Sequence, residues 1–377
     1  MQKTNNWQRI WNDDGSSNRC RPAKTVLSAI SLVYRLIINL RNWFYDRKLF
    51  TEVKLPCPVI SVGNITVGGT GKTPCVIWLA RMLQERGFRP AVLSRGYGAK
   101  TSQPVNIVSD GVHVLLPAAK AGDEPYLMAQ TLKNIPIIIG PKRTLTGMAA
   151  IEKFGVNILV CDDAFQHRQI FRDINLVLLD SQKPFGNGYL LPRGELREPA
   201  AGISRADAVI ITRTNEGKEE NLAGGQLAAV QNIPIFRSAH KTVDAVKGDY
   251  SGQLSLAELQ GKKICAFAGI ARPDSFKKIL ERAGMQIISF DIFPDHHPYN
   301  RKELENIYHN FINTGADLLI TTEKDGMRLR EFPEPAKNIY LLRIELALIP
   351  DDNSLKKFIL EKLQDKTPPD QKRGQTT

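Results

Sequence analysis

The chain has 377 residues, of which 42% are hydrophobic and 24% charged, and its 28 glycines and 22 prolines follow no period. The length predicts two domains or one large domain with an appendage, and the composition excludes a disordered, collagen-like or multi-span membrane protein. The 51 Lys and Arg against 39 Asp and Glu give a net charge of +12, which favours anionic partners. Five widely spaced cysteines argue against a disulfide framework or a cysteine-ligated zinc site.

Half of the excess positive charge lies in residues 1–54, which hold ten Lys or Arg and four Asp or Glu. The same stretch carries the most apolar segment, Val26 to Leu40. This run is shorter than the roughly 20 residues that a membrane span needs, and it contains Arg35. Aromatic residues and cations follow it, which favours a helix lying in the headgroup layer of an anionic membrane. A helix docked on the core and a true span are the alternatives.

Beyond Lys54 the chain alternates short β-rich runs with helical patterns such as Pro74 to Arg86 and Arg143 to Phe154. The candidate strands are Val59 to Val62, Ala91 to Ser94, Ile135 to Ile139, Ile158 to Cys161, Leu176 to Leu179, Ala208 to Thr212 and Ile233 to Arg237. Near-continuous Val, Ile and Leu are typical of parallel strands buried on both faces. The pattern predicts an α/β fold with a doubly wound, mostly parallel sheet.

A second α/β series begins near Lys262. Its predicted elements are strand Ile264 to Ala268, helix Asp274 to Ala283, strand Gln286 to Phe290, helix Arg301 to Ile312, strand Leu318 to Thr321 and strand Ile339 to Ile344. We therefore expect an N-terminal membrane-associating segment over residues 1–50, a main domain over 51–239 and a smaller α/β domain over 240–345. A last helix over 352–364 is expected to pack back on the main domain, and the polar tail 365–377 to be disordered.

The strongest chemical signal is Val59 to Thr73, VISVGNITVGGTGKT, in which a buried strand opens into a glycine-rich loop and then a helix. Consecutive backbone N–H groups and the helix N-terminus can wrap a phosphate chain there. Lys72 would reach the β- and γ-phosphates, and the Thr73 hydroxyl would face Mg²⁺. The first position of the P-loop pattern is Thr66 instead of glycine. The alternative is a glycine-rich turn with a chance Gly-Lys-Thr.

A second strand, Asn157 to Cys161, ends in Asp162 and Asp163. Carboxylates at the carboxyl end of a parallel strand face the crevice in which open α/β sheets bind ligands. One of them can hold Mg²⁺ while the other tunes the metal or positions the nucleophile. The alternative is an exposed Asp pair that opens an ordinary turn.

Three further motifs are weaker in isolation. Gly122-Asp123-Glu124-Pro125 precedes an apolar helix, where acidic residues are also routine caps. The loop Phe293 to Pro298 holds His296 and His297, and loop histidines are more often solvated than catalytic. Phe185 to Pro199, FGNGYLLPRGELREP, is too polar and rich in turn residues for a core, and loops of this kind often form ligand sites.

Taken together, the motifs resemble the tetraacyldisaccharide 4'-kinase family, the lipid A 4'-kinases of bacterial endotoxin synthesis, from about Leu36 to Leu363. The resemblance rests on SVGNITVGGTGKTP, LSRGYGAK, AGDEP, DDAFQHR, FGNGYLLPRGELREP, ADAVIITR, FAGIARPDSF, FPDHH and TTEKDGMRL, in this order. It implies a P-loop domain and a smaller domain that closes over the nucleotide. It also implies transfer of the ATP γ-phosphoryl group to the 4'-hydroxyl of a tetraacylated glucosamine disaccharide 1-phosphate.

The resemblance also implies roles for individual residues. ATP would be bound by Thr66, Val67, Gly68, Gly69, Thr70, Gly71, Lys72 and Thr73. Mg²⁺ would be held by Thr73, Asp162, Asp163 and Glu124. Asp123 would act on the acceptor hydroxyl together with His296, and Lys72 would assist catalysis. Further site candidates are Arg143, His167, Arg197 and Glu198.

The resemblance implies the lipid A disaccharide precursor as a partner and the cytoplasmic face of the bacterial inner membrane as the location. The charge of the N-terminal segment favours anionic membrane lipid as a second partner, and we expect a monomer. A ParA- or MinD-like ATPase is one rival reading, but those loops carry a Lys where this chain has Val67. A nucleic-acid-binding module is the other. No basic stripe with interleaved aromatic residues supports it, and the charge gathers beside the apolar segment, where acidic lipid explains it better.

Overall fold

The computed structural model describes residues 21–101, 103–215, 230 and 232–364. Within them, 13 strands form one sheet in the order β11-β10-β12-β13-β8-β7-β6-β1-β5-β2-β4-β3, with β9 paired to β8. The strands are β1 Val59–Asn64, β2 Pro90–Ser94, β3 Asn106–Ser109, β4 Ile137–Ile139, β5 Ile158–Asp162, β6 Ile174–Asp180, β7 Ala208–Thr212, β8 Ile235–Lys247, β9 Gln253–Ser255, β10 Lys263–Ala268, β11 Gln286–Ile292, β12 Leu318–Thr322 and β13 Ile339–Ile349. The predicted tail 365–377 and residues 1–20 lie outside the described residues.

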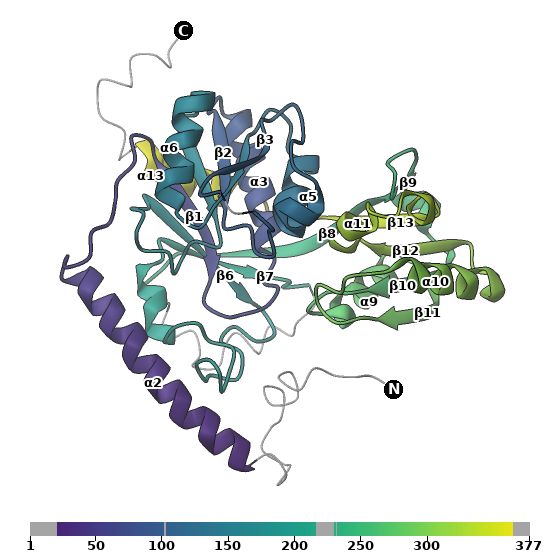
Figure 1. The fold of residues 1–377 in the computed structure, drawn as a ribbon, viewed down its shortest axis with the longest axis horizontal. Coiled ribbons are helices and arrows are strands. Elements are labelled where there is room, and N and C mark those ends of the chain that lie inside the picture. The colour runs from purple at the N-terminus through teal and green to yellow at the C-terminus, as the bar shows by residue number, and fades with distance from the viewer. Residues whose placement is uncertain (1–20, 102, 216–229, 231, 365–377) are drawn as a thin grey trace.

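Helices flank this sheet. They are α2 Arg21–Asp46, α3 Lys72–Glu85, α4 Ala118–Ala121, α5 Asp123–Thr131, α6 Arg143–Phe154, the 3-10 helix η2 Ala200–Arg205, α8 Leu256–Leu259, α9 Pro273–Arg282, α10 Arg301–Thr314, α11 Glu323–Leu329, α12 Pro333–Ala336 and α13 Asn353–Gln364. We call β1 to β7 with α3 to α6 the first lobe, and β9 to β12 with α8 to α12 the second lobe. Figure 1 shows the two lobes side by side, with β8 and β13 running between them.

The first lobe is the predicted parallel sheet, with β3 as an antiparallel edge strand. Alternate residues of β5 face opposite layers. Val160 packs in the cluster that holds Leu79 of α3, whereas Leu159 packs with Ala150 of α6. Because both faces are covered, the strands read as continuous apolar runs. The P-loop strand β1 lies between β5 and β6, so its carboxyl end opens in the middle of the sheet.

The second lobe continues the same sheet instead of forming a separate one. The antiparallel pair of β8 and β13 connects the lobes, with Leu346 opposite His240 and Leu341 opposite Val246. The strand predicted at Ile233 to Arg237 therefore begins later and runs much further than expected. Its polar, alternating second half lacks the Val and Ile run that marks a strand buried on both faces. The division at residues 239 and 240 falls inside β8 and stays a prediction.

Helix α13 packs on the first lobe. Leu355 and Ile359 lie in the cluster that holds Leu79 of α3, and Lys362 Nζ is 3.7 Å from Asp207 Oδ1. After the second lobe, α13 therefore brings the chain back to the lobe that carries the P-loop.

Helix α2 lies along the first lobe and projects from it (Figure 1). The Ser31 hydroxyl donates to Leu190 O at 2.9 Å, and the Tyr34 hydroxyl donates to Arg197 O at 2.7 Å. Its other side is an exposed apolar stripe that includes Val26, Ile30, Val33, Leu36, Ile37 and Leu40. By length and composition, this helix is the one among the described residues that could cross a membrane.

Candidate functional site

The P-loop follows β1 and ends at the first turn of α3. Gly68 and Gly71 have φ of 101° and 84°, a left-handed region that favours glycine. Gly71 is the N-cap of α3, so the first N–H groups of that helix open toward the loop. Gly68 and Gly69 are exposed, whereas Thr66 and Thr70 are buried. The geometry is that of an anion-binding loop at a helix N-terminus.

Hydrogen bonds from neighbouring side chains fix the conformation of this loop. Asn64 Nδ2 donates to Thr70 Oγ1 at 3.0 Å, and Thr212 Oγ1 donates to Thr70 O at 3.0 Å. Arg213, which is paired with Asp180, donates from Nη2 to Gly69 O at 2.6 Å. Because side chains already satisfy these groups, the loop is preformed.

The 185–199 segment borders the other end of the loop. Val67 N donates to Glu195 O at 2.8 Å, and Arg197 N donates to Ile65 O at 2.9 Å. The predicted polar loop therefore lies against the phosphate-binding turn. It also carries the Arg197 side chain to the carboxylates at the end of β5.

Asp163 links two of the predicted cations. Its carboxylate accepts from Arg197 Nη1 at 2.8 and 2.9 Å, and Lys72 Nζ lies 3.5 Å from Oδ1. Burial acts to raise the pKa of Asp163, but Lys72 and Arg197 outweigh burial and lower the pKa below its ordinary value. Asp163 also has a φ of 49°, a conformation that non-glycine residues keep mainly at functional sites.

Asp162 has the opposite electrostatic environment. Its Oδ2 accepts from Ser94 Oγ at 2.9 Å, whereas its buried Oδ1 has no hydrogen-bond partner among the described residues. Burial, together with the neighbouring Glu124 and Asp163 carboxylates, raises the pKa of Asp162 well above its ordinary value. An unsatisfied buried carboxylate oxygen beside a phosphate loop fits a bound cation, which would restore its charged form.

The remaining candidates on this side of the sheet are more deeply placed. Arg143 is 2% exposed and donates to Gly140 O and Asp162 O. His167 is half-buried, and burial and the nearby Arg143 lower its pKa to about 4. Glu198 is fully buried and accepts from Arg205 at 2.6 Å. Arg143 thus contacts the backbone at the end of β5, and Glu198 contacts Arg205 of η2.

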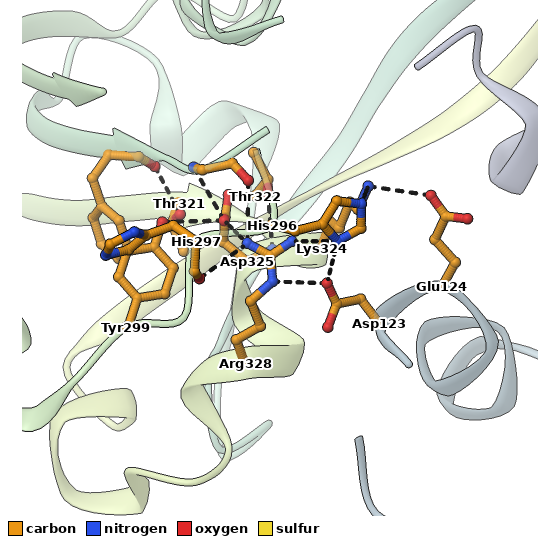
Figure 2. A network of polar contacts seen from close by, with 12 residues as sticks. Asp123, Glu124, His296, His297, Tyr299, Thr321, Thr322, Lys324, Asp325 and Arg328 are labelled. Carbon is orange, nitrogen blue, oxygen red and sulfur yellow. Dashed lines mark hydrogen bonds and ion pairs between the residues drawn. The ribbon is translucent and has the colours of Figure 1, made fainter. Parts of the chain in front are cut away.

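Asp123 and His296, which are 173 residues apart, meet at the junction of the lobes (Figure 2). Asp123 is the first residue of α5, and His296 lies in the loop after β11 with a φ of 57°. Their closest atoms, Asp123 Oδ2 and His296 Nδ1, are 3.0 Å apart. The structure thus brings the two predicted catalytic residues into direct contact, with one contributed by each lobe.

Lysine 324 fixes the direction of this hydrogen bond. Lys324 Nζ is 3.2 Å from His296 Nε2 and 3.2 Å from Glu124 Oε1. An ammonium group has only donors, so a ring that accepts from Lys324 at Nε2 carries its proton on Nδ1, which donates to Asp123. Arg328 Nη2 also lies 3.5 Å from Nδ1. Glu124, predicted as a metal ligand, is paired with Lys324 here.

Arg328 is a second cation at the pair. Its Nε donates to Asp123 Oδ2 at 2.7 Å (Figure 2). Burial acts to raise the pKa of Asp123, but the hydrogen bond from His296 and the charge of Arg328 lower it below its ordinary value. Asp123 is therefore a carboxylate at neutral pH, as a proton acceptor must be.

Comparison with known proteins identifies the family. Residues 23–364 match the family described as tetraacyldisaccharide-1-P 4'-kinase. The tetraacyldisaccharide 4'-kinase of Syntrophus aciditrophicus is 46% identical over 371 residues, covering 95% of this chain and 98% of that protein. The corresponding protein of Desulfatibacillum aliphaticivorans is 43% identical over 90% of this chain and 92% of its own length. This chain belongs to the tetraacyldisaccharide 4'-kinase family.

A solved structure agrees with this assignment. The crystal structure of LpxK from Aquifex aeolicus in complex with ATP superimposes with a TM-score of 0.74 at 32% identity, covering 90% of this chain and 99% of that one. The family match spans α2, both lobes and α13. The predicted P-loop fold and the predicted kinase family are therefore confirmed.

Two residues that contact the candidate catalytic pair were not predicted from the sequence. Lys324 and Arg328 belong to the motif TTEKDGMRL, which contributed to the resemblance without any role assigned to it. Their spacing of four residues places both on one side of α11. The sequence signal for these two residues was a pair of basic residues with helical spacing, in a motif that this chain shares with the family. Among the described residues, no group of three or more His, Cys, Asp or Glu could hold a metal.

Proposed function

We propose that this kinase transfers the γ-phosphoryl group of ATP to the 4'-hydroxyl of a tetraacyldisaccharide 1-phosphate, giving ADP and the 4'-phosphorylated lipid A precursor. The observation that carries the proposal is the contact between Asp123 and His296 at the lobe junction. The first lobe, which supplies Asp123, also carries the preformed P-loop. Family membership specifies the acceptor. The contact supplies a proton acceptor for a hydroxyl group.

The donor side is formed by Thr66 to Thr73. The loop N–H groups would bind the phosphate oxygens of ATP, and Lys72 would move from Asp163 to the transferred phosphate, where its charge is needed. Arg197 would then keep the Asp163 carboxylate in place. The P-loop therefore requires little rearrangement other than the exchange of one ion pair.

We assign Mg²⁺ to the same side. Thr73 and Asp162 would hold it, directly or through water, and the unsatisfied Asp162 Oδ1 is the observation that fits a cation. Such a site has few protein ligands, because Mg²⁺ in kinases takes most of its ligands from phosphates and water. When bound, the ion neutralises charge on the phosphate oxygens. Asp163 and Glu124 are the other predicted ligands. Asp163 is engaged by Lys72 and Arg197, and Glu124 is engaged by Lys324.

On the acceptor side, a sugar hydroxyl has to lose its proton as its oxygen attacks phosphorus. Asp123 Oδ2 already accepts from His296 and Arg328, whereas Oδ1 has no partner among the described residues. Oδ1 is therefore the oxygen available to the hydroxyl. His296 orients the carboxylate and can share the proton, which compensates for the weak basicity of a lone Asp.

We also propose where the enzyme works. Its acceptor is a lipid, and the exposed apolar stripe of α2 provides a surface that can enter a bilayer. ATP restricts the reaction to the cytoplasmic face of the inner membrane. Because a single chain supplies both Asp123 and His296, a monomer has a complete site.

The test is phosphoryl transfer by the full-length protein in detergent, with Mg-ATP and tetraacyldisaccharide 1-phosphate, followed by mass spectrometry for one added phosphate. The variants Asp123→Ala and His296→Ala should each lose most of the activity. The double variant should be little worse than the poorer single variant, because groups that act as a unit are not additive. Absence of product in every detergent would refute the assignment, and multiplicative losses would refute the paired roles.

A further inference from the structure

The lobe junction contains a basic pair on α11 that faces an acidic pair on α5. Arg328 Nε is 2.7 Å from Asp123 Oδ2, and Lys324 Nζ is 3.2 Å from Glu124 Oε1 (Figure 2). Both acidic residues lie in the first turn of α5. These two ion pairs cross from one lobe to the other at the place where the candidate catalytic residues meet.

Arg328 is anchored within its own lobe by groups other than Asp123. Its Nη1 donates to Asp325 Oδ1 at 3.0 Å, to Gly269 O at 3.1 Å and to His297 O at 3.5 Å. The guanidinium is therefore held at the loop after β10 and at the residue that follows His296.

The anchor itself is rigid. Asp325 is fully buried and also accepts from Gly269 N at 3.1 Å, from the Tyr299 hydroxyl at 3.1 Å and from the Thr322 hydroxyl at 2.6 Å. A carboxylate fixed by this many donors orients the arginine paired with it. The position of the Arg328 guanidinium is thus set before Asp123 is engaged.

The remaining edge of the guanidinium points across the junction. Nε donates to Oδ2 of Asp123, the same oxygen that accepts from His296 Nδ1. Two donors from the second lobe therefore converge on one carboxylate oxygen of the first lobe. This fixes the carboxylate rotation and leaves Oδ1 directed away from both donors.

We propose that Arg328 is a positioning residue for phosphoryl transfer, which fixes the Asp123 carboxylate and the loop of His296 in one arrangement across the two lobes. The inference rests on the roles proposed above for Asp123 and His296. It differs from a purely structural ion pair in a specific way: the benefit of Arg328 exists only when the catalytic pair is present.

Arg330 provides a matched control. It lies two residues further along the chain and also reaches α5, with Nη2 3.5 Å from Gln130 Oε1. Its guanidinium lies over the rings of Tyr126 and Tyr250, at 5.6 and 4.8 Å from their centroids. Among the described residues, the contacts of Arg330 include neither Asp123 nor His296. The variant R330A therefore measures how much activity is lost when an arginine at this junction is removed without disturbing the catalytic pair.

The first measurement is steady-state kinetics of the full-length variants R328A, R328K and R330A in detergent, with Mg-ATP and tetraacyldisaccharide 1-phosphate. Misplacing a reacting group by about 1 Å can cost about 100-fold, so we expect R328A to lower kcat by this order with KM for ATP nearly unchanged. R328K should not restore kcat, because an ammonium cannot make the Asp325 and Asp123 contacts at once. R330A should stay close to wild type.

The second measurement compares R328A in the wild-type and H296A backgrounds. Positioning predicts a large loss of kcat in the wild type and a loss below about threefold in H296A. An equal loss in both backgrounds, or a loss of R330A equal to that of R328A, would overturn the inference. Full activity of H296A would instead refute the proposed catalytic pair. If R328A does not fold, R328K, which retains the positive charge, is compared in the wild-type and H296A backgrounds instead.

Discussion

Gly63 offers a test of how closely the P-loop strand and the two aspartates are coupled. It lies in β1 opposite Val177 of β6, and a Cβ added there would lie 2.6 Å from Phe165 Cβ and 2.9 Å from Phe165 N. Phe165 follows Asp162 and Asp163 by a few residues and is fully buried. Phe165 N belongs to the backbone, and the position of Phe165 Cβ is fixed by the backbone, so no change of side-chain rotamer relieves the clash.

The magnitude follows from these distances. Atoms in contact lie about 3.5–4.0 Å apart, so Gly63→Ala has to move the segment at Phe165 by about 1 Å. Overpacking of this kind costs about 1–3 kcal/mol of unfolding free energy. The same shift displaces Asp162 and Asp163 from the phosphate site, for which we expect a loss of about 100-fold in kcat.

Urea unfolding and kinase turnover together measure both effects. The control is Gly252→Ala, where the added Cβ would meet only the flexible Lys247 side chain, at 3.4 Å. This variant should stay within about 0.5 kcal/mol of wild type and keep its activity. If Gly63→Ala were as stable and as active as the control, the close approach of β1 to the loop after β5 would not exist in solution.

Three further predictions concern charge and surface. Lys72→Ala should lower kcat by several orders of magnitude without changing the urea midpoint, because it removes charge stabilisation of the transferred group; activity within about tenfold of wild type would contradict this. Deleting residues 1–38 should reduce sedimentation with anionic vesicles while turnover in detergent survives better than on vesicles, and undiminished sedimentation would place the membrane contact elsewhere. Burial, with nearby Arg213, lowers the pKa of His240 to about 4, below the ordinary 6.5. The unfolded state therefore binds more protons as pH falls from about 6.5 to 4, and stability should decline over that window. His240→Gln should lose less stability than wild type between pH 7 and 5 in urea unfolding, and an equal loss would assign the acid sensitivity to other groups.

The elements of the first lobe could be predicted because local chemistry determines them. Val59 to Thr73 combines a buried strand, a glycine loop and a helix start, and Arg143 to Phe154 has the bounds expected from its apolar spacing. Strand β8 was underestimated, because only part of it is apolar on both faces. Helix α11 was missed, since it is short, polar and interrupted by Gly326.

The site could be predicted only in part for a related reason. The roles proposed for Lys72 and Asp162 rest on short-range spacing. Nothing in spacing brings Asp123 near His296, and that pairing came from the resemblance to the family. Spacing marks Arg328 as one of a basic pair on α11 but does not place it against Asp123, because that contact depends on the fold of the second lobe around Asp325. Burial of Glu198 beside Arg205 likewise depends on how the 185–199 segment packs.

The docking of α2 has a consequence for the choice of hydroxyl group. Tyr34 binds the backbone of Arg197, and the Arg197 side chain binds Asp163, so the helix and the phosphate site share one short, rigid segment. If the apolar stripe of α2 lies in the bilayer as proposed, the height of the phosphate site above the lipid surface is fixed by the protein. A headgroup whose acyl chains stay in the membrane can then present only the hydroxyl that reaches this height. Regioselectivity would arise from depth as well as from contacts with the sugar.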